Sequence, residues 1–203
     1  MPARDGGDAL AILYSGDGGW ARLDKSVAAD LVDAGVPVVG YNSLRYFWRP
    51  RTSAAAAADL SAVIEDYTAK WRRRRVILIG YSFGADALPA IVERLPARSR
   101  AKVQMLALIS PEATGRLHVR LGGWFPPSTG EGFSVTAALA QLRGLPTVCI
   151  YGAGDPHAAC RRFPPSLVRA VPLAGGHHLD RRYAAVARVL LNASEAQALA
   201  DAH

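Results

Sequence analysis

The sequence predicts a doubly wound α/β fold, on the basis of three observations. Apolar, β-branched stretches alternate with helical patterns along the chain. These apolar stretches are nearly continuous, which is typical of parallel strands buried on both faces. The chain has 203 residues, of which 50% are hydrophobic, and this is enough for one domain with a sizeable core. We therefore expect residues 1–203 to form a single domain.

The elements alternate in a regular order from the amino terminus. Six strands are expected, at Ala9–Tyr14, Pro37–Tyr41, Val76–Tyr81, Val103–Ile109, Thr147–Tyr151 and Leu167–Leu173. Apolar side chains recur at helical spacing between them, in Leu23–Leu31, Leu60–Trp71, Leu88–Leu95 and Tyr183–Leu190. This alternation predicts a mainly parallel sheet with helices on both faces. The tail from Ser194 to His203 is expected to be a frayed helix end.

One connection is too long and too rich in turn residues to be a plain loop. It runs over residues 115–132 and contains the segment Gly122-Gly123-Trp124-Phe125-Pro126-Pro127. Long connections in compact domains are usually functional, so residues 115–132 are a candidate lid or substrate-binding loop.

The most informative segment is Gly80-Tyr81-Ser82-Phe83-Gly84, which ends an apolar strand and opens into a helical pattern. A G-x-S-x-G sequence at a sharp turn from strand to helix forms a nucleophile elbow, which projects the serine hydroxyl above the sheet. The two glycines let neighbouring backbone pass close by. The motif alone is weak evidence, but the strand before it and the helix after it make Ser82 the candidate nucleophile.

An acid and a base follow later strands in an informative order. Ser82 follows the third strand, Asp155 follows the fifth and His177 follows the sixth. Function in open α/β sheets gathers at the carboxyl ends of the strands, and the order serine, acid, histidine is that of α/β-hydrolases. In such a triad the imidazole takes the serine proton and the carboxylate orients the imidazole. We therefore expect a reduced, six-stranded α/β-hydrolase fold.

Two triad positions have alternatives. Asp155 precedes Pro156, a pattern that is also typical of a helix N-cap. The base has two adjacent candidates, and we favour His177 because Gly175 and Gly176 free the backbone to aim the next side chain; His178 would then be a neighbour in the site or a packing residue. Adjacent histidines on an extended loop diverge, and no carboxylate cluster completes a ligand set, so we expect no metal site.

The first strand runs into a glycine-rich loop, Ser15-Gly16-Asp17-Gly18-Gly19-Trp20. Backbone N–H groups near Gly16 or Asp17 are expected to form an oxyanion hole with the N–H of Phe83, the residue after the nucleophile. A phosphate-binding loop is the alternative, but no G-K-[ST] sequence follows.

The formal net charge of +7 favours anionic partners. Much of the excess lies in residues 45–51 and in Arg72–Arg75, although the second tract also fits a solvated helix end. No motif for nucleic-acid recognition is present, so none is expected as a partner. The chain has no apolar run of membrane-spanning length, and Met1–Asp8 lacks the apolar region of a signal peptide. The two cysteines fit no metal-site spacing.

Several segments together resemble the VirJ/AcvB family of bacterial virulence-associated α/β-hydrolases, from about Leu10 to Leu191. They are Ser15–Trp20, Ser43–Trp48 with Arg51-Thr52, Gly80–Asp86, Cys149–Gly152 and Gly176–His178. The resemblance implies a periplasmic protein and, for AcvB-like members, a lipase that hydrolyses aminoacylated phosphatidylglycerol, notably lysyl-phosphatidylglycerol. By position, Ser82 matches the lipase-motif serine, Asp155 the acid region and His177 the base. The acid loop, residues 152–156, is poorer in acidic residues than is usual for the family.

Several residues of this sequence suit an aminoacylated phospholipid as the substrate. Cleavage of an aminoacyl ester needs no cofactor, but headgroup selection needs carboxylates near the serine, and Asp17 and Asp86 are the candidates. Asp86 lies four residues after Ser82 on the same predicted helix face, although a carboxylate there also suits the helix dipole. Tyr46, Phe47 and Trp48, between Arg45 and Arg49, are candidate walls of an acyl or headgroup site and candidate contacts with an anionic membrane surface.

Export, as the family resemblance implies, predicts a disulfide between Cys149 and Cys160 that clamps the segment carrying Asp155. Two other functions stay open at this point. One is a binding or accessory module that assists secretion-system proteins, and the other is a generic carboxylesterase or thioesterase with a deep apolar acyl pocket. The fold alone does not distinguish them.

Overall fold

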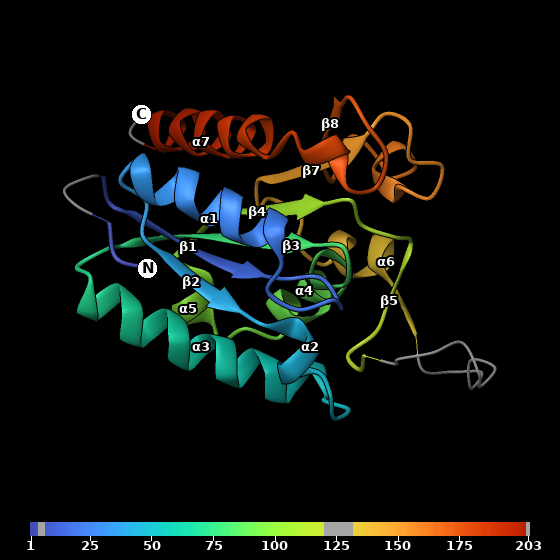
Figure 1. Ribbon diagram of the computed structural model, residues 1–203. Coiled ribbons are helices and arrows are strands. Elements are labelled where there is room, and N and C mark those ends of the chain that lie inside the picture. Colours follow the sequence, from blue (N-terminus) through green and yellow to red (C-terminus); the bar gives the residue numbers. More distant parts are fainter. Residues whose placement is uncertain (4–6, 120–131, 202–203) are drawn as a thin grey trace.

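The computed structural model describes residues 1–3, 7–119 and 132–201. A six-stranded sheet in which every pairing is parallel lies at its centre, with the strand order β2-β1-β3-β4-β7-β8 (Figure 1). The strands are β1 (Ala9–Tyr14), β2 (Val38–Tyr41), β3 (Arg75–Tyr81), β4 (Val103–Ile109), β7 (Thr147–Gly152) and β8 (Arg169–Leu173). The predicted six-stranded parallel sheet is confirmed.

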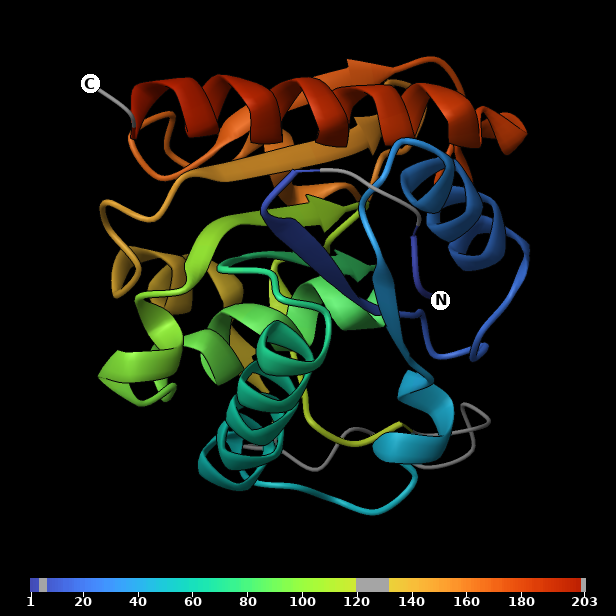
Figure 2. The same cartoon turned by 90° about the vertical axis from the view of Figure 1, so that its left-hand side faces the viewer.

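Helices cover both faces of the sheet. Helices α1 (Arg22–Asp33) and α7 (Tyr183–Ala200) pack side by side on one face, whereas α3 (Ser53–Lys70) and α4 (Phe83–Glu93) pack on the other. Figure 2 shows α3 and α7 on opposite sides of the strands. Successive residues of β1 point to alternate faces, so that Leu10 joins one apolar cluster and Ala11 the other. Each cluster joins the side chains of one sheet face to those of the helices that cover it.

Shorter elements occupy the connections. They are α2 (Ser43–Tyr46), α5 (Ala97–Arg100), α6 (Val135–Ala140), the two-stranded antiparallel pair β5 (Thr114–Gly115) and β6 (Phe133–Ser134), and the 3₁₀ turns η1 (Ala159–Arg161) and η2 (Leu179–Arg181). Residues 120–131, the greater part of the candidate lid, lie outside the described residues. Among the described residues, no helix is both long and apolar enough to cross a bilayer.

The last strand differs from the expected burial on both faces. Strand β8 pairs only with β7 and forms one edge of the sheet, where Arg169, Ala170 and Pro172 are exposed. An edge strand has a neighbour on one side only, so its side chains are less covered than those of central strands.

Two helices are longer than their apolar spacing indicates. Helix α3 begins at Ser53 because Thr52 Oγ1 accepts a hydrogen bond from the N–H of Ala55 at 3.1 Å, and the alanines that follow provide a helical first turn. Helix α7 continues to Ala200, so the tail expected to fray from Ser194 is regular helix up to that residue. Gln104 Nε2 donates to the carbonyl of Ser194 at 2.8 Å, and this buried contact joins α7 to β4 at Ser194.

The arginine tract at residues 72–75 lies where α3 leads into β3, at the amino ends of the strands. Arg74 and Arg75 form ion pairs with Asp8 at 2.8 and 3.6 Å. Ser82 follows the other end of β3, so this tract and the nucleophile candidate lie at opposite edges of the sheet.

Candidate active site

Ser82 stands on the turn between β3 and α4. Its φ is +50° and its ψ is −117°, a strained conformation for a residue with a side chain. A Cβ atom on Gly80 would lie 2.5 Å from the backbone of Gly84, and one on Gly84 would collide with the carbonyl oxygen of Tyr14. Only glycines at both positions let helix and sheet approach this closely, and this contact holds the turn that presents the Ser82 hydroxyl.

The structure brings Ser82, His177 and Asp155 into one hydrogen-bonded chain. His177 Nε2 lies 3.0 Å from Ser82 Oγ, and His177 Nδ1 lies 2.9 Å from Asp155 Oδ2. The carboxylate accepts a hydrogen bond from Nδ1–H, which leaves the Nε2 lone pair free to accept the proton of the serine hydroxyl. Residues 95 and 22 positions apart in the sequence thus meet at the carboxyl edge of the sheet.

Asp155 combines the two roles that its sequence context indicates. It is 3% exposed, and its Oδ1 accepts a hydrogen bond from the N–H of His157 at 2.9 Å while its Oδ2 contacts His177. Burial by itself would raise the pKa of Asp155, but the hydrogen bonds from His157 and His177 outweigh it and hold the pKa below its ordinary value. The carboxylate is therefore charged at neutral pH.

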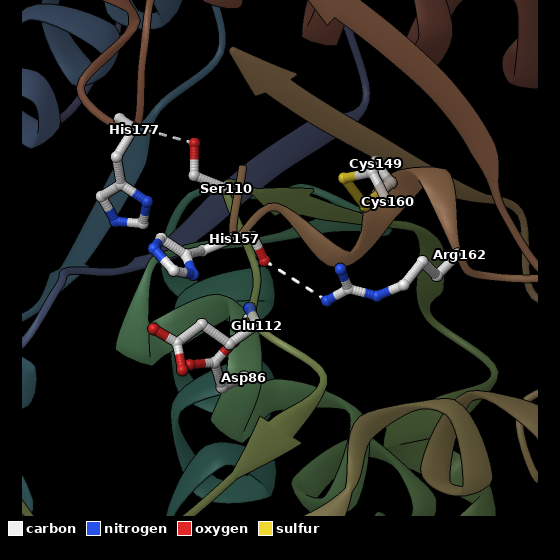
Figure 3. Close-up of a disulfide and its surroundings, with 8 residues drawn as sticks. All are labelled: Asp86, Ser110, Glu112, Cys149, His157, Cys160, Arg162 and His177. Carbon is white, nitrogen blue, oxygen red and sulfur yellow. Dashed lines mark hydrogen bonds between the residues drawn. A yellow bond between two sulfur atoms is a disulfide. The ribbon is translucent and has the colours of Figure 1, made fainter. Parts of the chain in front are cut away.

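The loop that carries His177 is fixed by a residue that sequence reasoning missed. Ser110 follows β4 with a φ of +50°, and its hydroxyl donates to the carbonyl of His177 at 3.0 Å (Figure 3). On the other side, Gly152 has no room for a Cβ atom because the carbonyl of Gly176 passes against it. The only sequence signal for Ser110 is a serine and a proline directly after a buried strand.

His178 lies beside the triad histidine. Its Nδ1 is 2.6 Å from the hydroxyl of Tyr81, and its ring meets that of His177 edge-on with centroids 5.4 Å apart. Burial raises the pKa of Tyr81 above its ordinary value, so the phenol stays protonated. Ser82 contacts His177 and not His178.

The glycine-rich loop after β1 reaches the nucleophile. A Cβ atom on Gly16 would lie 3.6 Å from Ser82 Cβ, and the Gly16 carbonyl accepts the N–H of Gly19 at 3.1 Å in a tight turn. Ser15 Oγ accepts the N–H of Ser43 at 3.0 Å, which ties the loop to α2. Phe83 is the first residue of α4, where backbone N–H groups have no partner within the helix.

A cavity of about 200 Å³ opens beside Ser82. Its lining is mostly polar and is formed by Asp17, Ser82, Phe83, Asp86, Glu112, Thr114, Arg116, His118 and Val119. Asp86 is 8% exposed and accepts the N–H of Glu112 at 2.7 Å, and Figure 3 shows the two carboxylates next to each other. Burial raises the pKa of Asp86 to about 7. The cavity therefore presents three acidic side chains, together with Arg116, to a group bound next to the serine hydroxyl.

The three consecutive aromatics do not act together. Phe47 is fully buried and its ring packs 5.3 Å from that of Phe83, so its prediction as a wall of the site is corrected: it belongs to the core. Tyr46 donates its hydroxyl to Asp59 at 2.6 Å, whereas Trp48 is 55% exposed. The turn of α2 directs the Phe47 side chain into the core and leaves the Trp48 side chain in solvent.

Cys149 of β7 and Cys160 of η1 are joined by a disulfide, with Cα atoms 5.6 Å apart (Figure 3). The bond spans the turn that holds Asp155. Among the described residues, no group of three or more His, Cys, Asp or Glu side chains is arranged to hold a metal ion.

Reduction of the disulfide should lower the free energy of unfolding by about 3 kcal/mol, because the crosslink closes a short loop in the unfolded chain. The measurement is urea denaturation with and without reductant, followed by a thiol count on the denatured, non-reduced protein. Two titratable thiols in that sample would show that the bond does not form.

Replacement of Asp86 by asparagine should change how stability depends on pH. A folded-state pKa of about 7 against an ordinary 3.8 means that the folded protein binds this proton more tightly than the unfolded chain. The contribution of Asp86 to the free energy of unfolding is therefore fully present below pH 3.8 and is lost as the pH rises through 7. The slope is at most about 1.4 kcal/mol per pH unit. The measurement is urea unfolding of wild type and Asp86→Asn over this pH range. All other titrating groups are common to both proteins, so the difference between their free energies of unfolding reports on Asp86. If the free energies of unfolding of the two proteins changed with pH in parallel, the prediction would be contradicted.

A family model described as "Bacterial virulence protein (VirJ)" matches residues 8–198. No curated protein matches the chain.

Solved structures show the fold at low sequence identity. Est1E from Butyrivibrio proteoclasticus is similar with a TM-score of 0.69 and 15% identity, over 94% of this chain and 88% of that one. The Pyrococcus furiosus esterase Pf2001 gives a TM-score of 0.67 and 14% identity, over 94% and 81%. A putative dienelactone hydrolase from Klebsiella pneumoniae gives 0.66 and 13%, over 96% and 90%.

The structural matches identify the architecture as the α/β-hydrolase fold, as the order of the triad candidates predicted. The family model covers nearly the whole chain, including every strand of the main sheet. The protein therefore belongs to the VirJ family of bacterial virulence proteins.

Proposed function

We propose that this protein is a serine hydrolase that cleaves a carboxylic ester. The observation that carries the proposal is the continuous hydrogen-bonded chain from Ser82 through His177 to Asp155. A serine hydroxyl is a poor nucleophile until a base removes its proton, and a carboxylate that accepts from Nδ1 keeps the imidazole in the required tautomer. The fold of the esterases and other hydrolases described above is compatible with this chemistry.

The reaction would proceed through an acyl-enzyme. Ser82 Oγ attacks the ester carbonyl carbon while His177 Nε2 takes the hydroxyl proton, and a tetrahedral oxyanion forms. When the carbon–oxygen bond of the ester breaks, the imidazolium returns the proton to the leaving alcohol. A water molecule, deprotonated by the same imidazole, then attacks the acyl-enzyme, and the acid is released when the bond to Ser82 Oγ breaks and the imidazolium returns the proton to that oxygen.

The oxyanion needs hydrogen-bond donors close to Ser82 Oγ. We assign this role to the backbone N–H of Phe83 and to an N–H of the loop at Gly16 or Asp17. The loop backbone packs against Ser82, and Phe83 supplies the first N–H of α4. No metal ion or cofactor is needed for this step.

The cavity beside Ser82 favours a small cationic acyl group over a fatty-acyl chain. Its volume of about 200 Å³ and its three acidic side chains suit an aminoacyl group. An ammonium group buried without a partner would cost several kcal/mol, so carboxylates such as Asp86 and Asp17 would select for it. Together with the family resemblance, this supports the aminoacyl ester of aminoacylated phosphatidylglycerol, such as lysyl-phosphatidylglycerol, as the substrate.

Two features bear on the competing functions. A generic carboxylesterase would need a deep apolar acyl pocket, whereas the cavity that includes Ser82 among the described residues is mostly polar. A binding module that assists a secretion system would not need Asp155 to face the imidazole, yet the carboxylate lies 2.9 Å from it. A periplasmic location, implied by the family resemblance and compatible with the disulfide, is part of the proposal.

The test compares two bonds in related lipids. Purified protein should release free lysine from lysyl-phosphatidylglycerol much faster than it releases fatty acid from unmodified phosphatidylglycerol. Preferential release of fatty acid would overturn the headgroup assignment in favour of a generic esterase.

Neutralising a cavity carboxylate should reduce lysine release more than hydrolysis of a small neutral ester. We expect Asp86→Asn or Asp17→Asn to lower lysine release by about tenfold or more, which corresponds to about 1.4 kcal/mol of transition-state binding. Both kcat/KM values are measured for each variant, with Asp66→Asn on the exposed face of α3 as the matched control. Equal losses on both substrates would instead assign that aspartate to the fold or to oxyanion geometry.

A further inference from the structure

We propose that Arg45, Trp48 and Arg49 form a docking rim that places the Ser82 cavity against the surface of an anionic phospholipid bilayer. The inference rests on the proposed function, because it names the surface on which a lipid substrate would be met. It is carried by three observations on this rim: its position, its exposed indole and its two exposed arginines, which form no ion pair with the residues that the structure describes.

The rim adjoins the cavity wall. The N–H of Val119 donates to the carbonyl of Phe47 at 2.9 Å, and the N–H of Arg51 donates to the carbonyl of Leu117 at 3.1 Å. Val119 and its neighbour His118 line the cavity that contains Ser82. The segment that carries Trp48 therefore runs directly alongside the segment that forms one side of the cavity.

Trp48 is unusual in its exposure. Among the described residues, only three large hydrophobic side chains are exposed, and the other two, Met1 and Leu199, lie near the chain ends. The indole stands on a fixed base, because Phe47 is fully buried and the Asn42 side chain caps α2 by accepting the N–H of Arg45 at 3.1 Å. Indoles held in this way partition to the headgroup region of a bilayer, where one part of the ring is apolar and the other is wet.

The charged groups of the rim lie on exposed side chains. Arg45 and Arg49 are exposed, and in the part of the chain that the structure describes neither has a carboxylate at ion-pair distance. Arg51 differs, since it pairs with Asp59 at 3.1 Å and stacks on the Tyr46 ring at 4.1 Å. Arg51 therefore braces the rim, whereas the other two guanidinium groups remain available to lipid phosphates.

A bilayer fits this surface better than a nucleic acid. The patch is small, and the cavity next to it exposes Asp17 and Glu112, which would repel a polyanion lying across the site. A membrane surface meets the indole and both arginines of the rim and offers single headgroups to the adjoining cavity. The combination of an exposed indole with basic residues is also that of proteins that bind bilayer interfaces.

The test measures binding of the Ser82→Ala protein to vesicles, so that no lipid is consumed. We expect sedimentation with vesicles of equal parts phosphatidylcholine and phosphatidylglycerol, and much weaker sedimentation with phosphatidylcholine alone or at high salt. In this background Trp48→Ala should weaken binding by about tenfold. The pair Arg45→Gln and Arg49→Gln should weaken it by about 25-fold, since each arginine contributes about fivefold.

The matched control removes two arginines elsewhere. Arg72→Gln with Arg188→Gln has the same net charge as the rim pair, but Arg72 lies at the opposite edge of the sheet and Arg188 on α7. Thermal unfolding confirms that each variant is folded. Equal loss of vesicle binding in both double variants, or no loss in the rim variants, would overturn the proposal. Rim substitutions that weaken binding to duplex DNA but not binding to vesicles would overturn it as well. Because no turnover is measured, failure of the proposed hydrolase activity would leave this result interpretable.

Discussion

Replacing Ser82 by alanine is expected to lower ester hydrolysis by about four to six orders of magnitude while the protein stays folded. The hydroxyl is the group that forms the acyl-enzyme, and no other nucleophile contacts His177 Nε2 among the described residues. Folding should be little affected, because alanine keeps the same backbone conformation and loses one partly exposed hydrogen bond. The measurement is kcat/KM with a small chromogenic ester, together with thermal unfolding.

A second readout separates loss of chemistry from loss of structure. A fluorophosphonate probe should label the wild-type protein at Ser82 and leave Ser82→Ala unlabelled. Ser166→Ala serves as the control serine, since it removes an exposed hydroxyl that precedes β8, away from the carboxyl edge where Ser82 lies, and labelling at Ser82 should persist. Unchanged turnover in Ser82→Ala would refute the enzyme assignment.

The two neighbouring histidines should differ greatly when each is replaced by alanine. His177→Ala is expected to lose nearly as much activity as Ser82→Ala, because the members of a triad act as one unit. His178→Ala should cost less than about tenfold, since its ring nitrogen contacts the Tyr81 hydroxyl and neither Ser82 nor Asp155. The same chromogenic ester assay measures both.

The ranking of the two variants is the informative result. A larger loss in His178→Ala would mean that the base is the other imidazole and that the loop rearranges when substrate binds. Similar losses in both would indicate that the Tyr81 contact positions the whole loop.

The sequence predicts the sheet and the triad candidates because each depends on a local pattern. Continuous apolar runs identify parallel strands, and the carboxyl ends of such strands meet at one edge. Residues that directly follow strands, such as Ser82, Asp155 and His177, are therefore brought together by topology alone. Their order then indicates the class of fold.

The cavity wall is not predictable in the same way. Arg116 and His118 lie in a segment without periodicity, and its position depends on tertiary contacts such as the hydrogen bond from Val119 to Phe47. The sequence also does not show which ring of the aromatic run Tyr46-Phe47-Trp48 is buried. The short turn of α2 decides that Phe47 enters the core, and it is too short to leave a helical signature in the sequence.

Strand β8 also affects how copies of this protein meet in solution. The carbonyl of Leu173 accepts the N–H of Ala153 at 2.7 Å, so the polar backbone groups of Leu173 face inward and those of Pro172 face the solvent. A proline at that position removes a donor from the free edge of the sheet. Edge-to-edge addition of another strand, and with it fibrous aggregation of a protein kept at high local concentration, is thereby disfavoured without any loss of pairing inside the fold.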